Sequence, residues 1–217
     1  LPTELEIADK WVLSKLNTLI AEVTDNMERY ELGIAVQKIY DFIWDTYCDW
    51  YIELTKARLY SEDAQRKDTA LQVLVYVLDQ TLRLLHPFMP FITEEIWQSL
   101  PHEGEAEAVM ISRWPTWSEE LSFQKEEADF QKIIDIIRAI RNQRTEMNIP
   151  PSKKAKVYIE TAETEIFVNG IPFLQRLASA SEVEVGEKFE LPGAVQIITH
   201  AARALIPMDE LIDREKE

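Results

Sequence analysis

The stretch from Asp41 to Arg58, DFIWDTYCDWYIELTKAR, constrains the fold of this chain more than any other. Its large apolar side chains recur at three- and four-residue steps with no Gly or Pro between them, a period typical of an amphipathic α-helix. An aromatic face of this size has to be buried against apolar neighbours. Asp41, Asp45, Asp49 and Glu53 also step by four along one side, where like charges repel by about 0.2–0.5 kcal/mol per pair. We therefore expect this acidic stripe to face cations.

The aromatic stretch belongs to a series of predicted long helices. Apolar residues at helical spacing predict helices over about 8–30, 34–60 and 64–85, and a last one that begins between 119 and 124 and ends near 148. Prolines mark the later ends, because they remove a backbone donor and disfavour helical geometry before them. A short helix capped by Thr93 and a crossing segment anchored by Trp114 and Trp117 are expected before the last long helix. Residues 1–150 are thus predicted to be mainly α, an up-and-down helical bundle.

The pattern changes after Pro151. Residues 155–160 alternate as a strand, 163–178 form a helix interrupted by the turn Asn169-Gly170-Ile171-Pro172, and 183–186 and 193–198 are two more strand candidates. Residues 151–211 are therefore predicted to form a small α/β module. Residues 212–217 are charged helix formers without a cap, and we interpret them as the start of a truncated helix.

Composition and motifs exclude several classes of function. No run of 18 uncharged apolar residues occurs and LPTELEIADK lacks the regions of a signal peptide, so neither membrane insertion nor secretion is expected. The single cysteine, Cys48, fits a reducing cytoplasm and is interpreted as a small core side chain. The sequence has no phosphate-binding glycine loop, no nucleophile elbow and no zinc-type Cys/His spacing. We predict no catalytic residues, no metal site and no cofactor.

Charge is distributed unevenly. The net charge is −16, which by itself disfavours a nucleic-acid partner. Between Lys132 and Lys156, however, seven cations stand against two acids, a balance of +5. The cations are Lys132, Arg138, Arg141, Arg144, Lys153, Lys154 and Lys156. A basic patch on an acidic body is a recognised footprint of nucleic-acid binding.

The three arginines of the last long helix drift around its axis. With about 100° per residue and Ile133 at the origin, Arg138 lies near 140°, Arg141 near 80° and Arg144 near 20°. Arg144 therefore falls on the apolar face, where a charge has to be paired. Two interpretations stay open: salt bridges from these arginines, or from Arg83, to the acidic stripe, and a phosphate-binding edge continued by Lys153 and Lys154.

Four segments carry a family resemblance. They are ADKWVLSKLN at 8–17, CDWYIELTK at 48–56, LHPFMPFITEEIW at 85–97 and IRAIRNQRTEMNIPP at 137–151. In this order and spacing they resemble the anticodon-binding region of bacterial valyl-tRNA synthetases. The third segment alone is similar to the wider group that includes the isoleucyl and leucyl enzymes, whereas the second and fourth are similar to the valyl member.

The resemblance implies a bundle of the class I synthetase anticodon-binding type, then a small α/β module and a coiled-coil arm. It also implies a cytoplasmic parent enzyme that ligates valine to its tRNA with ATP and magnesium. The class I catalytic signatures and the editing domain are absent, so this fragment is expected to be non-catalytic. Its expected partners are the anticodon stem-loop of the valine tRNA and the missing catalytic domain and arm.

Charge placement supplies the candidate tRNA-binding residues: Arg138, Arg141, Arg144, Lys153 and Lys154, with Lys56 and Arg58 as further candidates. Two alternatives stay open. A helical-bundle scaffold for protein interactions would expose a large apolar patch. The equivalent domain of an isoleucyl-tRNA synthetase would be followed by a cysteine-rich zinc module, and no such module occurs in this sequence.

Overall fold

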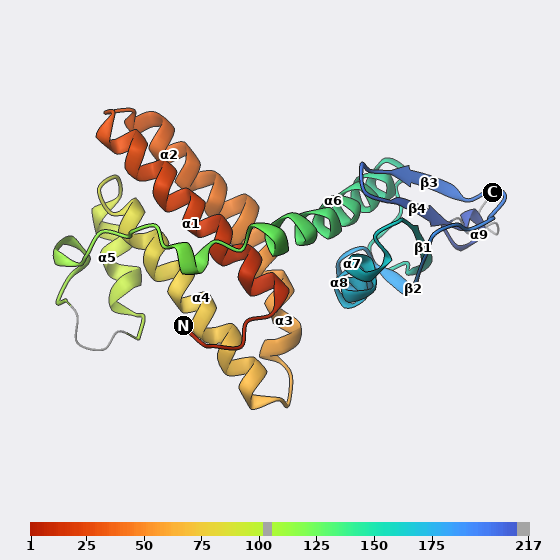
Figure 1. The fold of residues 1–217 in the computed structure, drawn as a ribbon, viewed down its shortest axis with the longest axis horizontal. Coiled ribbons are helices and arrows are strands. Elements are labelled where there is room, and N and C mark those ends of the chain that lie inside the picture. Colours follow the sequence, from red (N-terminus) through yellow and green to blue (C-terminus); the bar gives the residue numbers. More distant parts are fainter. Residues whose placement is uncertain (102–105, 212–217) are drawn as a thin grey trace. The chain divides into compact units, whose positions relative to one another are not determined.

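The computed structural model describes residues 1–101 and 106–211, and Figure 1 traces them along the chain. The chain divides into two compact units, residues 1–127 and 128–217, which we call unit 1 and unit 2. Unit 1 is helical. Unit 2 combines most of one long helix with a small mixed sheet and short helices.

Unit 1 is built on long helices that follow one another closely in sequence. They are α1 (Ile7–Glu28), α2 (Leu32–Asp41), the π-helical segment η1 (Phe42–Ile52), α3 (Glu53–Leu59) and α4 (Ala64–Leu85). In Figure 1, α1 and α2 run side by side and α4 crosses beside them. Asp63 caps α4 by accepting hydrogen bonds from the amides of Gln65 and Arg66, both at 3.1 Å.

The predicted helix over 34–60 is continuous, but it is not α-helical throughout. Over Phe42–Ile52 it winds as a π-helix, whose hydrogen bonds reach back five residues instead of four. Phe42 and Tyr47, five residues apart, are both buried as a result. Trp44 is turned outward and is 50% exposed, so the prediction that the whole aromatic run is buried is wrong at this residue.

The short helix α5 (Pro90–Gln98) begins at Pro90, three residues before the predicted cap. Proline suits the first turn of a helix, where its missing N–H is not needed. Thr93 is therefore not the N-cap; its hydroxyl lies within the first turn and donates to the Met89 carbonyl at 2.8 Å. Trp97 is fully buried on α5, and its indole N–H donates to Asp79 of α4 at 2.7 Å.

The segment after α5 crosses unit 1 in short turns, η2 (Val109–Ile111) and η3 (Glu119–Leu121). Trp114 anchors it by donating its indole N–H to the Thr24 hydroxyl at 3.0 Å. Trp117 is 54% exposed, so its predicted anchoring role is wrong. The crossing is held instead by Asn17, whose side chain pairs with both the amide and the carbonyl of Ser118.

The last long helix, α6 (Gln124–Glu146), lies within its predicted range, and its residues from Ala128 on belong to unit 2. The isoleucine stripe of α6 is fully buried, as its spacing predicts. Gly170 lies against this stripe, since a Cβ there would come within 2.8 Å of the Ile133 side chain. Phe130 and Phe173 pack edge to face with centroids 5.2 Å apart.

The remainder of unit 2 is a four-stranded sheet with short helices. The strands are β1 (Ala155–Glu160), β2 (Ala180–Gly186), β3 (Val195–Ile198) and β4 (Arg203–Ile206). Their order is β2-β1-β4-β3, with β1 parallel to β2 and the other pairs antiparallel. The helices α7 (Thr164–Asn169) and α8 (Ile171–Leu177) form the β1–β2 connection, and α9 (Met208–Leu211) follows β4.

The predicted fold class is confirmed at the level of a helical region followed by a small α/β module. The boundaries at 150 and 211 stay a prediction. The interpretation of 212–217 as a truncated helix lies outside the described residues. Strand β4 and helix α9 were not predicted; both are only four residues long, and β4 is fixed by its pairing with β1 and β3. None of the described helices is long and apolar enough to cross a membrane.

Candidate nucleic-acid interface

The second half of α6 presents basic and polar side chains on its exposed side. Arg138 and Arg141 are exposed and three residues apart, a spacing that places them on the same side of a helix. Asn142 and Thr145 are exposed as well, and the Thr145 hydroxyl donates to the Arg141 carbonyl at 2.9 Å. This face therefore offers two guanidinium groups and neutral hydrogen-bonding groups to a partner.

The connection from α6 to β1 continues the basic surface. Lys154 is exposed and Lys153 is half-buried. The Lys153 amide donates to the Pro150 carbonyl at 3.1 Å, so residues 150–153 form a turn. Both predicted lysines thus lie in the short connection that follows α6. We call residues 138–154, which comprise the second half of α6 and this connection, the basic edge.

Salt bridges neutralise both ends of the longer patch predicted from the sequence. Lys132 contacts Glu163 at 2.6 Å and Asp129 at 3.3 Å. Lys156, on β1, contacts Glu184 at 2.5 Å and Glu182 at 3.1 Å across to β2. The excess of positive charge is therefore concentrated in the basic edge, where five cations stand against the single acid Glu146.

Arg144 behaves differently from its neighbours on α6. Its residue is only 5% exposed, in agreement with its predicted place on the apolar face. One guanidinium nitrogen, Nη2, donates to the Pro150 carbonyl at 3.2 Å and also to the Lys153 carbonyl. Burial lowers the pKa of Arg144. Its partners are backbone carbonyls, so the predicted salt bridge to the acidic stripe is wrong for this residue.

Lys56 and Arg58 lie in unit 1 and are both engaged there. Lys56 is half-buried and pairs with Glu53, one helical turn earlier. Arg58 is 4% exposed and clamps the fully buried Asp9 of α1, with Nη1 2.7 Å from Oδ2 and Nη2 2.5 Å from Oδ1. This geometry gives Arg58 a role in holding α3 to α1, and it disfavours the prediction that Arg58 contacts tRNA.

Tyr51 completes the buried cluster around Asp9. Its hydroxyl donates to Asp9 Oδ1 at 2.6 Å. Burial, together with the charge and hydrogen bond of Asp9, raises the pKa of Tyr51 well above its usual value. Burial alone would lower the pKa of Arg58, but the hydrogen bonds and charge of Asp9 outweigh it and raise that pKa. Tyr51 therefore stays neutral and Arg58 stays charged across the neutral range.

The acidic stripe of the aromatic helix is largely solvated. Asp41, Asp45 and Asp49 are exposed, and in the described part of the chain only Glu53 has a cation in ion-pair contact, Lys56. Arg83, one of the predicted partners, instead contacts Asp79 on its own helix at 3.0 Å. The stripe needs no cationic neighbour because water screens its repulsion.

Exposed aromatic side chains beside this stripe were missed from the sequence. Tyr40 and Trp44 are 57% and 50% exposed, and their ring centroids lie 6.2 Å apart. The α-helical period hid them, because the turn into the π-helix changes which side chains point outward. Asp41 and Asp45 are neighbours of the pair in sequence and are exposed, so this surface of unit 1 repels phosphate.

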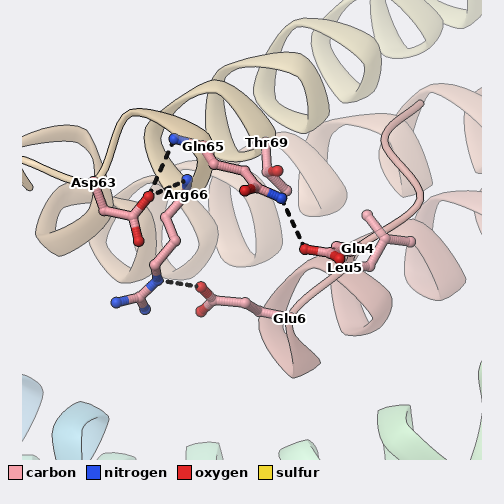
Figure 2. A pocket seen from close by; sticks show the side chains of 7 residues that line it. All are labelled: Glu4, Leu5, Glu6, Asp63, Gln65, Arg66 and Thr69. Atoms are coloured by element: carbon pink, nitrogen blue, oxygen red, sulfur yellow. Dashed lines mark hydrogen bonds and ion pairs between the residues drawn. The ribbon is translucent and has the colours of Figure 1, made fainter.

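A recess between the N-terminal segment and the start of α4 offers no alternative site for an anionic partner. Figure 2 shows its polar lining. Arg66 contacts Glu6 at 2.9 Å, and Gln65 donates to Glu4 at 2.9 Å. Three carboxylates against one cation give this recess an acidic character. Within residues 1–101 and 106–211, no cluster of His, Cys, Asp and Glu side chains could hold a metal ion.

Comparisons with known proteins agree with the sequence resemblance. Residues 9–159 match the family described as the anticodon-binding domain of tRNA ligase. The chain is 48% identical to the valine–tRNA ligase of Clostridium perfringens, 49% to that of Clostridium acetobutylicum and 43% to that of Bacillus cereus, over 99% of its own length. It spans about 24% of the length of these relatives. Neither the scaffold nor the isoleucyl alternative is favoured by these matches.

Proposed function

The chain belongs to the family of anticodon-binding domains of tRNA ligases, and from this premise we propose that it binds the anticodon stem-loop of a valine tRNA. The protein that contains it would ligate valine to that tRNA with ATP and magnesium in the cytoplasm. The activating and transferring chemistry would belong to a catalytic domain outside this chain. The chain itself would contribute recognition and positioning of the tRNA.

The observation that carries the proposal is the basic edge. Two ion-pair clusters neutralise the cations on either side of it, around Lys132 and Lys156. A net positive charge remains along the basic edge, where the exposed side chains are cationic or neutral, apart from Glu146. A hairpin backbone is recognised by such a surface, because Lys and Arg displace counterions from phosphates.

The candidate residues would have different roles in RNA binding. Arg138, Arg141 and Lys154 are exposed, so they are proposed to contact phosphates directly, with Lys153 beside them. An exposed guanidinium plane would also accept an unstacked loop base. Lys56 is a weaker candidate, since Glu53 already offsets its charge. Arg58 would act only through the fold, because Asp9 occupies its guanidinium.

The architecture supports the same proposal. A run of helices over 1–146 followed by a small sheet fits an up-and-down bundle of the class I synthetase type, with an α/β module after it. Residues 1–150 and 151–211 would be these two domains. The other proposed partners are the catalytic domain and the coiled-coil arm of the same protein.

A titration of labelled anticodon hairpins tests the proposal. The hairpin with a valine anticodon and one with a permuted loop are titrated at two salt concentrations. We expect tighter, salt-sensitive binding of the valine hairpin. Arg141→Ala with Lys154→Ala should weaken binding of both hairpins and reduce the salt slope by about 0.7–0.9 for each phosphate that the variant no longer neutralises.

Lys188→Ala is the matched control, because it removes an exposed cation of unit 2 that lies off the basic edge and pairs with Glu190 at 3.5 Å. Its affinity and salt slope should equal those of the wild type. If the wild-type chain bound neither hairpin, or if Lys188→Ala and the double variant weakened binding equally, the assignment of binding to this edge would be rejected.

A further inference from the structure

The connection between α6 and β1, which carries Lys153 and Lys154, is short, and hydrogen bonds fix its backbone at both ends. α6 ends at Glu146 and β1 begins at Ala155. The Ile149 amide donates to the Arg144 carbonyl at 2.9 Å, and the Asn148 amide donates to the Thr145 carbonyl at 3.0 Å. This pair of bonds is a Schellman motif, and Asn148 supplies its left-handed residue with φ 55°.

The side chain of Arg144 fixes the second half of the connection by hydrogen bonds to its backbone. Its Nη2 bridges the carbonyls of Pro150 and Lys153, the first and last residues of the turn. The backbone of Arg144 therefore fixes the start of the connection and its guanidinium fixes the end. Both bonds come from the single nitrogen Nη2, whose place is set by the planar guanidinium, whereas the ammonium of a lysine lies on a flexible stem and is more strongly hydrated, so it is less suited to this buried position.

The charge of Arg144 is not neutralised. Among residues 1–101 and 106–211 no carboxylate lies within ion-pair distance of it, and its Nη1 is buried without a hydrogen-bond partner. Burying a cation in this way is costly, since neutral carbonyls offset only part of the lost hydration. A cation buried at such a cost beneath an exposed basic surface points to a function of that surface.

We propose that Arg144 is a positioning residue for the basic edge: it locks residues 148–153 so that Lys153 and Lys154 stand at a fixed place after Arg141. This inference rests on the proposed function, and it assigns Arg144 a different role from Arg138 and Arg141. Those arginines meet phosphates. Arg144 sets the geometry in which the lysines meet them, and its uncompensated charge raises the potential of the same surface.

A double-mutant cycle in hairpin binding tests the inference. Arg144→Met should weaken binding of the valine hairpin about tenfold, and Lys154→Ala alone about threefold, which is roughly the effect of one phosphate contact. In the Arg144→Met background, Lys154→Ala should change the affinity by less than twofold, because the lysine is already misplaced. Arg144→Lys, which keeps the charge, should not restore wild-type affinity. Additive effects, or full restoration by Arg144→Lys, would overturn the positioning role and favour direct contact.

Amide hydrogen exchange without RNA gives a second, independent measurement. Arg144→Met should speed exchange of the Ile149 and Lys153 amides while the amides of β1 stay protected. Arg138→Met is the matched control: it removes an exposed arginine of the same helix and should leave exchange at both amides unchanged. Equal exchange in Arg144→Met and wild type would contradict the positioning role of Arg144. Absence of hairpin binding by the wild type would instead reject the proposed function, and with it any role of Arg144 in RNA binding.

Discussion

Arg58 in unit 1 and Arg144 in unit 2 are both buried, yet their charges meet opposite surroundings. Arg58 forms a two-pronged bond with the carboxylate of Asp9, so its charge is cancelled inside the protein. Arg144 is held by two carbonyls and keeps its charge. A cancelled charge serves the fold alone, whereas an uncancelled one still contributes to the field at the nearby surface.

The two arginines also differ in what they hold together. Arg58 and Asp9 are 49 residues apart, so their bond joins two helices of unit 1. Arg144 reaches carbonyls only six and nine residues away and shapes one connection. Loss of the first pair should therefore be felt across unit 1, and loss of the second mainly at the basic edge.

Asp9→Asn should have the largest effect on stability. It removes the only carboxylate that hydrogen-bonds the buried Arg58 guanidinium in the described part of the chain and leaves Glu6 at 3.7 Å as the remaining charge partner, which costs about 3–5 kcal/mol of unfolding free energy. Urea unfolding followed by tryptophan fluorescence measures this loss in unit 1, because all six tryptophans lie between Trp11 and Trp117. Asp25→Asn is the control, since it breaks the exposed pair with Arg29 and should cost less than about 1 kcal/mol. Equal losses of unfolding free energy in the two variants would contradict the distinction between the buried and the exposed ion pair.

Arg144→Met should destabilise unit 2 by less, about 1–3 kcal/mol. The variant removes charge-assisted hydrogen bonds to two carbonyls but leaves no unpaired charge behind. Unit 2 has no tryptophan, so exchange of the slowest amides of α6 and β1 is the suitable measurement. A loss as large as that of Asp9→Asn would show that Arg144 supports the whole unit and not only the edge.

Sequence periodicity predicted most of the fold because each long helix shows its own buried stripe. The range 64–85 was predicted to the residue, and so was the strand 155–160. The π-helical segment was not predictable in this way, since the same aromatic run satisfies an α-helical period. Strand β4 was missed because its pairing with β1 and β3 is set by the tertiary fold.

The candidate site was predictable as a charge cluster but not in its detail. Helical angles placed Arg144 on the apolar face and Arg138 on the polar face, with Arg141 between them; the structure buries Arg144 and exposes Arg138 and Arg141. Charge placement alone could not separate Arg58 from these arginines, because its partner Asp9 lies on another helix. The neutralisation of Lys156 was equally hidden, since Glu182 and Glu184 reach it only through strand pairing.

Tyr51 extends the comparison to alkaline pH. Its pKa is raised by burial and by Asp9, so the unfolded chain, with a tyrosine pKa of about 10, ionises first. Stability is therefore unaffected by this group below about pH 10 and falls above it, by about 1.4 kcal/mol per pH unit until the folded-state pKa is reached. In urea titrations between about pH 9 and 11, the unfolding free energy of Tyr51→Phe should fall less steeply with pH than that of the wild type. The exposed Tyr40→Phe is the control, and an equal change in both variants would contradict the assignment.

The smallest effect distinguishes two lysines two residues apart. Lys156 is held by Glu184 and Glu182, so we expect no phosphate contact to be lost with it, and the two freed carboxylates would act on RNA only through screened, longer-range repulsion. Lys154 is exposed and forms no ion pair with the residues that the structure describes. We expect Lys154→Gln to weaken hairpin binding about threefold and to lower the salt slope by about 0.7–0.9, and Lys156→Gln to stay within about twofold of wild type. Binding titrations at two salt concentrations separate these outcomes. If Lys156→Gln weakened binding as much as Lys154→Gln, total charge rather than uncompensated charge would govern the basic edge, and the contrast between Arg58 and Arg144 would lose its functional meaning.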